Sequence, residues 1–155
     1  MLAYLQEDRG ALPYSCIEIA MRTLAKAQYK PAIKTLIEYL DLEEPGPQHV
    51  IRPAQVTAGL FPAAVALSKM GDQAIPYLKS AISNTDNSKV LRVNAAETYL
   101  SMAHDQAAAI SFVAKAARDP LEQAAGDALM HVAEGAVKGC REKNQQRCQE
   151  ALNQQ

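Results

Sequence analysis

Residues 74–78 read Ala-Ile-Pro-Tyr-Leu, and two other stretches follow the same pattern: Ala-Ile-Lys-Thr-Leu at 32–36 and Ala-Ile-Ser-Phe-Val at 109–113. Successive stretches lie 42 and 35 residues apart. Apolar residues recur three and seven positions after each isoleucine, which is the spacing of one face of an α-helix. Repetition at this period indicates a chain built from stacked structural repeats.

The segments between these stretches also carry helical periodicity. Small residues followed by leucine recur in them, as at Ala95, Ala96 and Leu100, and no segment shows the two-residue alternation of a strand. We therefore expect an all-α chain. The predicted helices cover residues 15–28, 30–40, 53–70, 72–83, 88–103, 105–117 and 120–137, with a polar helix near 141–153.

Residues that start and stop helices agree with these ranges. Gly71 suits the end of one helix, Pro76 falls in a first turn, and Pro62 is expected to kink the helix predicted over 53–70. Side chains able to cap a helix N-terminus stand at Ser15, Asp72, Ser88, Asp105 and Asp119.

These residues resemble HEAT-type repeats, which are antiparallel helix pairs. Residues 86–100 look like the start of such a repeat, and residues 72–78 look like the opening of its second helix. The resemblance covers about residues 15–137. It implies an α-solenoid of three to four antiparallel helix pairs with right-handed stacking. In the family, an Asp and an Arg six positions apart form a ladder between repeats; Asp86 and Arg92 match this pattern, but Asp119 is followed at that distance by Ala125, so the expected ladder is incomplete. A globular helical bundle is the alternative fold.

The resemblance also divides the chain. We expect an N-terminal extension over 1–14, the helical repeat domain over 15–139, and a polar C-terminal helical cap or tail over 140–155. End units of repeat proteins need polar outer faces, which the Gln-rich C-terminal segment provides. The predicted buried residues are Ile33, Leu36, Ile75, Leu78, Leu100, Ile110, Val113 and Leu129.

Charge bears on the class of partner. The 16 Lys and Arg residues nearly balance the 17 Asp and Glu residues, for a formal charge of −1. Because no overall positive field would attract a polyanion, nucleic acid and membrane surfaces are not expected partners. No stretch has the roughly 18 uncharged apolar residues that would cross a bilayer.

The three cysteines are too few for a disulfide scaffold, so a cytoplasmic location is the default expectation. Cys140 and Cys148 would lie about 12 Å apart along one continuous helix, but a turn near residues 143–144 would let them pair. Such a disulfide, or a removed signal peptide, would place the protein outside the cytoplasm instead. Cys16 is expected to be a small buried apolar residue.

Few residues offer catalytic chemistry. The chain lacks a Gly-x-Ser-x-Gly motif, a glycine-rich phosphate loop and a zinc-type cysteine spacing, so we expect no catalytic residues and no cofactor. One outside candidate is a metal site on a single helical face, formed by Asp127, His131 and Glu134. His104 is expected near a helix C-terminus, and His49 in the irregular segment 42–49.

The repeated second helices carry a partly aromatic column, because Tyr39, Tyr77 and Phe112 stand at related offsets. Aromatic side chains are frequent anchors in binding surfaces, although packing between repeats would explain the same residues. The predicted binding surface consists of Thr35, Glu38, Tyr39, Tyr77, Lys79, Phe112 and Lys115, with its charged members facing water.

Two functions follow from the resemblance. An extended face of second helices suits a non-catalytic module that binds a protein or peptide, and this is the expected function. The alternative comes from the HEAT-like repeats of phycobilin lyases, which hold a tetrapyrrole during its attachment to a partner protein. Metal binding at the three-residue site above is a further alternative.

Overall fold

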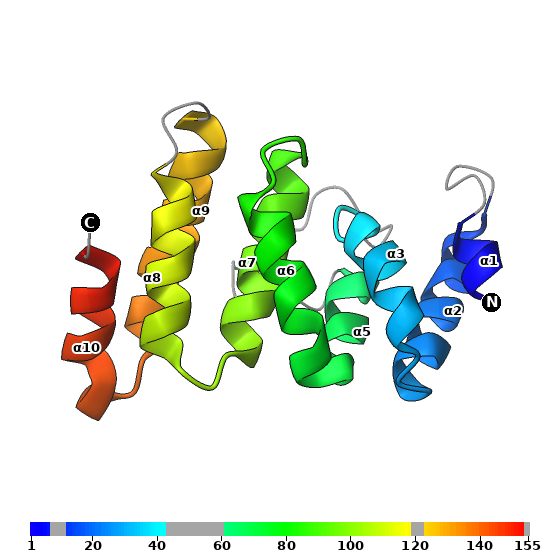
Figure 1. Cartoon of the computed structure of the whole chain (residues 1–155), viewed down its shortest axis with the longest axis horizontal. Coiled ribbons are helices and arrows are strands. Elements are labelled where there is room, and N and C mark those ends of the chain that lie inside the picture. The colour runs from blue at the N-terminus through cyan, green and yellow to red at the C-terminus, as the bar shows by residue number, and fades with distance from the viewer. Residues whose placement is uncertain (7–11, 43–60, 119–122, 154–155) are drawn as a thin grey trace, which may run out of the picture. The chain divides into compact units, whose positions relative to one another are not determined.

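The computed structural model describes residues 1–6, 12–42, 61–118 and 123–153 (Figure 1). In these residues every regular element is an α-helix or a 3₁₀ turn, so the predicted all-α fold is confirmed. The chain forms two compact units, Met1–Tyr77 (unit one) and Leu78–Gln155 (unit two).

In unit one, helix α5 is the element that the others pack against. It spans Pro62–Met70, and both α2 (Tyr14–Lys26) and α3 (Ile33–Glu38) contact it. The short α1 (Leu2–Leu5) packs on α2. Two 3₁₀ turns, Lys30–Ala32 and Gly71–Ala74, lead into α3 and α6 (Ile75–Ser83).

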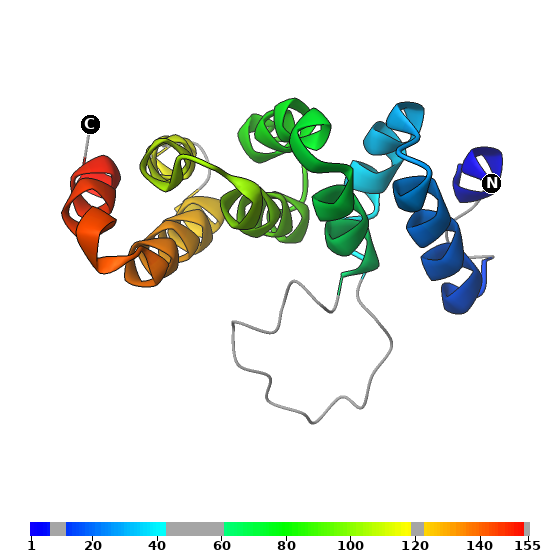
Figure 2. The same cartoon turned by 90° about the horizontal axis from the view of Figure 1, so that it is seen from below.

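In unit two, helix α9 (Gln123–Gly139) is the element that the other helices pack against. Both α7 (Lys89–Met102) and α8 (Gln106–Ala117) pack against it, and α10 (Glu142–Asn153) packs on α8 and α9. Within this unit α7 and α9 lie in one layer and α8 lies in another (Figure 2). The polar C-terminal segment is therefore a docked helix, which buries Cys148, Ala151 and Leu152.

Two of the predicted caps are confirmed. The Ser88 hydroxyl accepts a hydrogen bond from the Leu91 N–H at 3.2 Å, and the Asp105 carboxylate accepts one from the Ala108 N–H at 3.2 Å. Gly71 ends α5 with a φ of +66°, a backbone conformation that side chains disfavour.

Two other predicted caps are wrong, and Asp119 lies outside the described residues. Helix α2 begins at Tyr14 after Pro13, so Ser15 already lies within the first turn. Asp72 is the second residue of the 3₁₀ turn Gly71–Ala74, whose N-cap is Met70.

The predicted kink at Pro62 is also wrong. Pro62 is the first residue of α5, a position whose N–H has no partner in the helix, so proline costs no hydrogen bond there. Pro76 lies in the first turn of α6, as predicted.

Seven of the eight predicted core side chains are buried; the exception is Ile75, which is partly exposed. Ile75 is the first residue of α6, and helical side chains lean toward the N-terminus. Its side chain therefore leans past the start of its own helix. Cys16, predicted to be buried, is exposed on α2, while the next residue, Ile17, takes the core position.

Side chains from neighbouring elements bind the carbonyl groups at several helix ends. The Gln28 amide donates to Lys69 O at 2.7 Å at the end of α5, and the Gln106 amide donates to Leu100 O at 2.9 Å near the end of α7. Each bond satisfies an acceptor that the helix itself leaves without a partner. These bonds tie the end of one helix to the next element.

Arg92 has the same role at the end of α6. Arg92 is buried, and its Nε donates to Ile82 O at 2.9 Å at the end of α6. Asp86 is exposed, and in the described part of the chain its carboxylate makes no bond with Arg92. Arg92 therefore ties α7 to the backbone at the end of α6.

Candidate interaction surface

The predicted binding surface draws its residues from three helices. Thr35 and Glu38 lie on α3 with Tyr39 directly after it, Tyr77 and Lys79 lie on α6, and Phe112 and Lys115 lie on α8. The structure leaves some of these side chains exposed and buries others.

The α3 part of the prediction is wrong for two residues. Tyr39 is 1% exposed, and its hydroxyl donates to Leu5 O at 2.8 Å, so the ring belongs to the core of unit one. Thr35 is 4% exposed. Leu5 of α1 lies against Tyr39, and α5 packs on α3. Glu38 is exposed.

The α6 and α8 residues keep accessible surface. Tyr77 and Phe112 are partly exposed, and Lys115 is exposed. Lys79 is partly buried instead of facing open water, because its chain lies against aromatic rings of unit two.

A cluster of one cation and two rings lies at the centre of this region. The Lys79 Nζ lies 5.2 Å from the centroid of the Tyr99 ring and 5.1 Å from that of the Phe112 ring. The two rings meet edge to face, with centroids 5.8 Å apart and an interplanar angle of 82°. Attraction between the ammonium group and the ring faces holds Lys79 in place. The Tyr99 ring is itself fixed, because Tyr99 is almost fully buried.

Around the cluster, one stripe of α8 is open to solvent. Ala108, Phe112, Lys115 and Ala116 follow helical spacing, and all four are exposed or partly exposed. We call Lys79 together with these four residues the α6–α8 surface. It combines one partly exposed aromatic ring and two lysine side chains with two alanines.

Tyr99 is the residue that sequence reasoning missed. It lies on α7, and its contacts are with side chains 20 residues before it and 13 after it. No local spacing signals such a contact.

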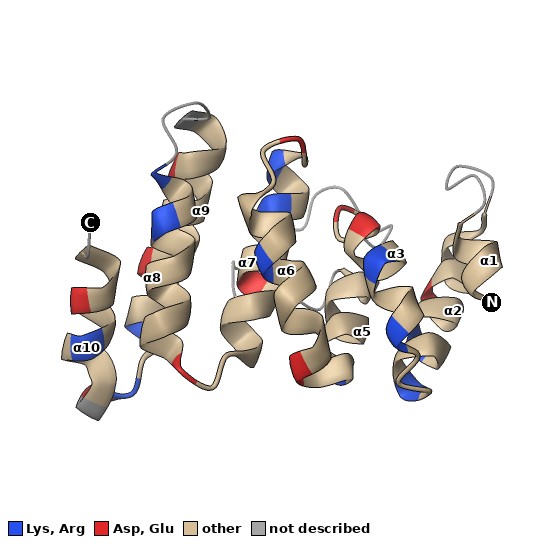
Figure 3. Ribbon diagram, in the orientation of Figure 1, with Lys and Arg blue, Asp and Glu red and all other residues tan. Residues whose placement is uncertain are grey.

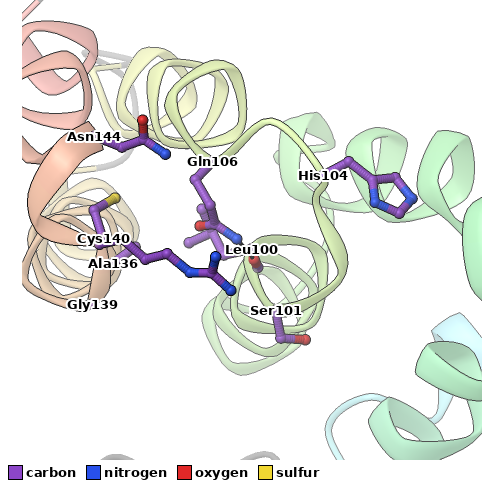
Figure 4. Close-up of a pocket in the computed structure, with 9 residues that line it drawn as sticks. Leu100, Ser101, His104, Gln106, Ala136, Gly139, Cys140 and Asn144 are labelled. Atoms are coloured by element: carbon purple, nitrogen blue, oxygen red, sulfur yellow. Dashed lines mark hydrogen bonds between the residues drawn. The ribbon is translucent and has the colours of Figure 1, made fainter.

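A pocket lies in unit two, at the ends of α7 and α9 and the starts of α8 and α10. Its volume is about 650 Å³. Gln106 and Asn144 lie on its sides, while His104 points away from both of them (Figure 4). The Gln106 amide donates to the Leu100 and Ala103 carbonyl groups, so it serves the end of α7. The His104 imidazole therefore does not converge with the Gln106 and Asn144 side chains in this pocket.

Cys140 lines this pocket and forms a disulfide with Cys148, with 6.7 Å between the two Cα atoms. The turn that permits the bond lies at residues 140–141, between α9 and α10, and not near residues 143–144 as predicted. The disulfide joins the end of α9 to the buried side of α10.

The candidate metal site is not formed. Within the described residues, no group of three His, Cys, Asp or Glu side chains is placed to hold a metal ion. Asp127 and Glu134 are seven residues apart on α9, which is about 10 Å along the axis. Two carboxylates that far apart do not converge on one ion beside His131. His49 and most of segment 42–49 lie outside the described residues.

Comparison with known proteins supports the repeat. Residues 63–84 match the family model described as PBS lyase HEAT-like repeat, which confirms the HEAT-like resemblance. The match runs from the second residue of α5 to the residue after α6, and so spans one helix pair. No curated protein and no solved structure matches the chain. None of the described helices is both long and apolar enough to cross a bilayer.

Proposed function

We propose that this chain is a non-catalytic interaction module that binds a protein or peptide, and that the α6–α8 surface is its contact region. The observation that carries the proposal is the partly exposed Phe112 ring, fixed between Lys79 and Tyr99. An anchor that is already ordered loses little conformational freedom on binding, which favours affinity.

Helix α8 also suits a binding surface because two of the accessible residues near Phe112, Ala108 and Ala116, are small. Ala108 and Ala116 stand one turn to either side of the ring, so a partner backbone would approach α8 closely and cover the ring edge. Energetically dominant interface residues are typically aromatic and surrounded by contacts that exclude water.

A peptide-display selection against the intact chain tests this proposal. Peptides enriched on the wild type would be measured by fluorescence polarisation against Phe112→Ala, which should weaken binding by about 1–3 kcal/mol. Tyr29→Ala is the matched control, since Tyr29 is an exposed aromatic residue in unit one. Unchanged affinity of a folded Phe112→Ala variant would show that the contact region lies elsewhere.

The description of the family model favours a second candidate, a protein that handles a tetrapyrrole. Titration of the chain into a bilin solution tests it directly. Binding would shift the visible absorption of the pigment, because a protein surface restrains its conformation. An unaltered spectrum at excess protein would reject this candidate and leave the interaction module unaffected.

A further inference from the structure

We infer that the α6–α8 surface binds a peptide segment rich in Asp and Glu, an inference that rests on the proposed function and names its partner class. The sequence has a net charge of −1, yet neither α6 nor α8 contains an acidic residue. Lys79 and Lys115 lie on these helices. Figure 3 shows basic residues on both helices. The surface is thus positive in a chain that is close to neutral.

Lys79 is prepared to receive a carboxylate. The Tyr99 and Phe112 rings position its ammonium group by attracting the positive charge. A ring face is not a carboxylate oxygen, so the N–H groups of Lys79 can still donate hydrogen bonds to a carboxylate. In the part of the chain that the structure describes, Lys79 forms no ion pair. Hydrogen bonds between ammonium and carboxylate groups are among the stronger polar contacts in proteins.

Among the described residues between α6 and α8, the acidic side chains are Asp86, Glu97 and Asp105. Asp105, the cap of α8, pairs with Arg147 at 2.9 Å at the start of the helix, whereas Lys115 stands in its last turn. Asp86 is exposed in the connection after α6, and Glu97 on α7 already has a partner. A partner that supplies carboxylates would therefore complement the charge of the surface.

The geometry favours a peptide over a nucleic acid. Bases bind to proteins by stacking on exposed ring faces, but Lys79 lies over both rings of the cluster. The exposed part of the Phe112 ring would pack against an aliphatic side chain of the peptide. A segment that alternates acidic and apolar residues would place carboxylates on Lys79 and Lys115 and an apolar side chain on Phe112.

Fluorescence polarisation with defined peptides tests the inference. The probe is a labelled twelve-residue peptide of repeated Glu-Leu-Glu-Gly, compared with the same peptide carrying Gln in place of Glu. The wild-type chain should bind the acidic peptide about tenfold or more tightly than the neutral one, and a rise from about 50 to 200 mM salt should weaken this binding several-fold because salt screens exposed charges.

Variants locate the effect. The double variant Lys79→Gln and Lys115→Gln should lose about tenfold or more in affinity for the acidic peptide, approaching the value for the neutral peptide. Lys138→Gln is the matched control, since Lys138 is an exposed lysine in the last turn of α9. It should change affinity by less than about twofold, and circular dichroism of all variants should match the wild type.

The outcomes separate this inference from the proposed function. Equal binding of both peptides, with both lost in Phe112→Ala, would leave the interaction module standing and reject the acidic partner. Binding of a selected neutral peptide alone would do the same. Tighter binding of a single-stranded DNA oligomer than of the acidic peptide would also overturn the inference. Failure of every peptide would reject the inference and the proposed surface together.

Discussion

Gly126 allows α9 to pass close to the end of α8, and its replacement by alanine should destabilise the chain. Gly126 is buried in the first turn of α9. A Cβ added there would overlap the backbone carbonyl oxygen of Ala117, the last residue of α8. Since this neighbour is backbone, it cannot rotate away as a side chain would, and one of the two helices must shift.

Two opposing contributions decide the magnitude. Alanine in place of glycine in a helix gains about 1 kcal/mol from propensity. Overpacking against a tightly packed neighbour costs about 1–3 kcal/mol, and contact with a fixed carbonyl group places this site toward the upper end. The free energy of unfolding of Gly126→Ala should therefore fall by about 1–2 kcal/mol relative to wild type.

Gly135→Ala is a matched control on the same helix. A Cβ at Gly135 meets nothing within 4 Å, so only the propensity gain applies, and this variant should be stabilised by up to about 1 kcal/mol. Urea unfolding followed by circular dichroism measures both variants. If Gly126→Ala were as stabilised as Gly135→Ala, the close approach of α9 to Ala117 would be refuted.

Three further changes test other parts of the fold. Leu78→Ala truncates a fully buried side chain of α6 and should lower the free energy of unfolding by about 2–5 kcal/mol in urea denaturation; a loss below about 1 kcal/mol would contradict its core position. Gly71→Ala should lower the thermal midpoint, because its φ of +66° strains a side chain by about 1 kcal/mol, whereas an equal or higher midpoint would argue against this conformation. Replacement of Cys140 and Cys148 by serine should cost about 2–3 kcal/mol from the released eight-residue loop and expose the amides of α10 to hydrogen exchange; unchanged protection would show that α10 docks without the disulfide.

The sequence alone predicts the helices and most of their core faces, because these depend on residues a few positions apart. The apolar spacing that repeats around Ile33, Leu78 and Ile110 predicts which side of each helix is buried. Ser88 and Asp105 cap helices through contacts only three residues away. These contacts join residues close in sequence, so a local pattern is enough to predict them.

Helix starts are less certain when two signals compete. Pro62 reads as a kink if the helix begins at 53 and as a favourable first residue if the helix begins at 62, and only the position of α5 distinguishes these readings. The pairing of Cys140 with Cys148 likewise depends on where a helix ends. The two residues pair because the chain turns directly after α9.

Tertiary structure determines which residues of the candidate surface stay exposed. Tyr39 and Phe112 occupy related positions in the repeat, yet Tyr39 is buried with its hydroxyl on Leu5 O, while Phe112 stays partly exposed beside Lys79. Helical periodicity states that a residue lies on a given side of its helix. Which neighbouring element covers that side depends on contacts between residues far apart in the chain, and those contacts leave no local pattern in the sequence.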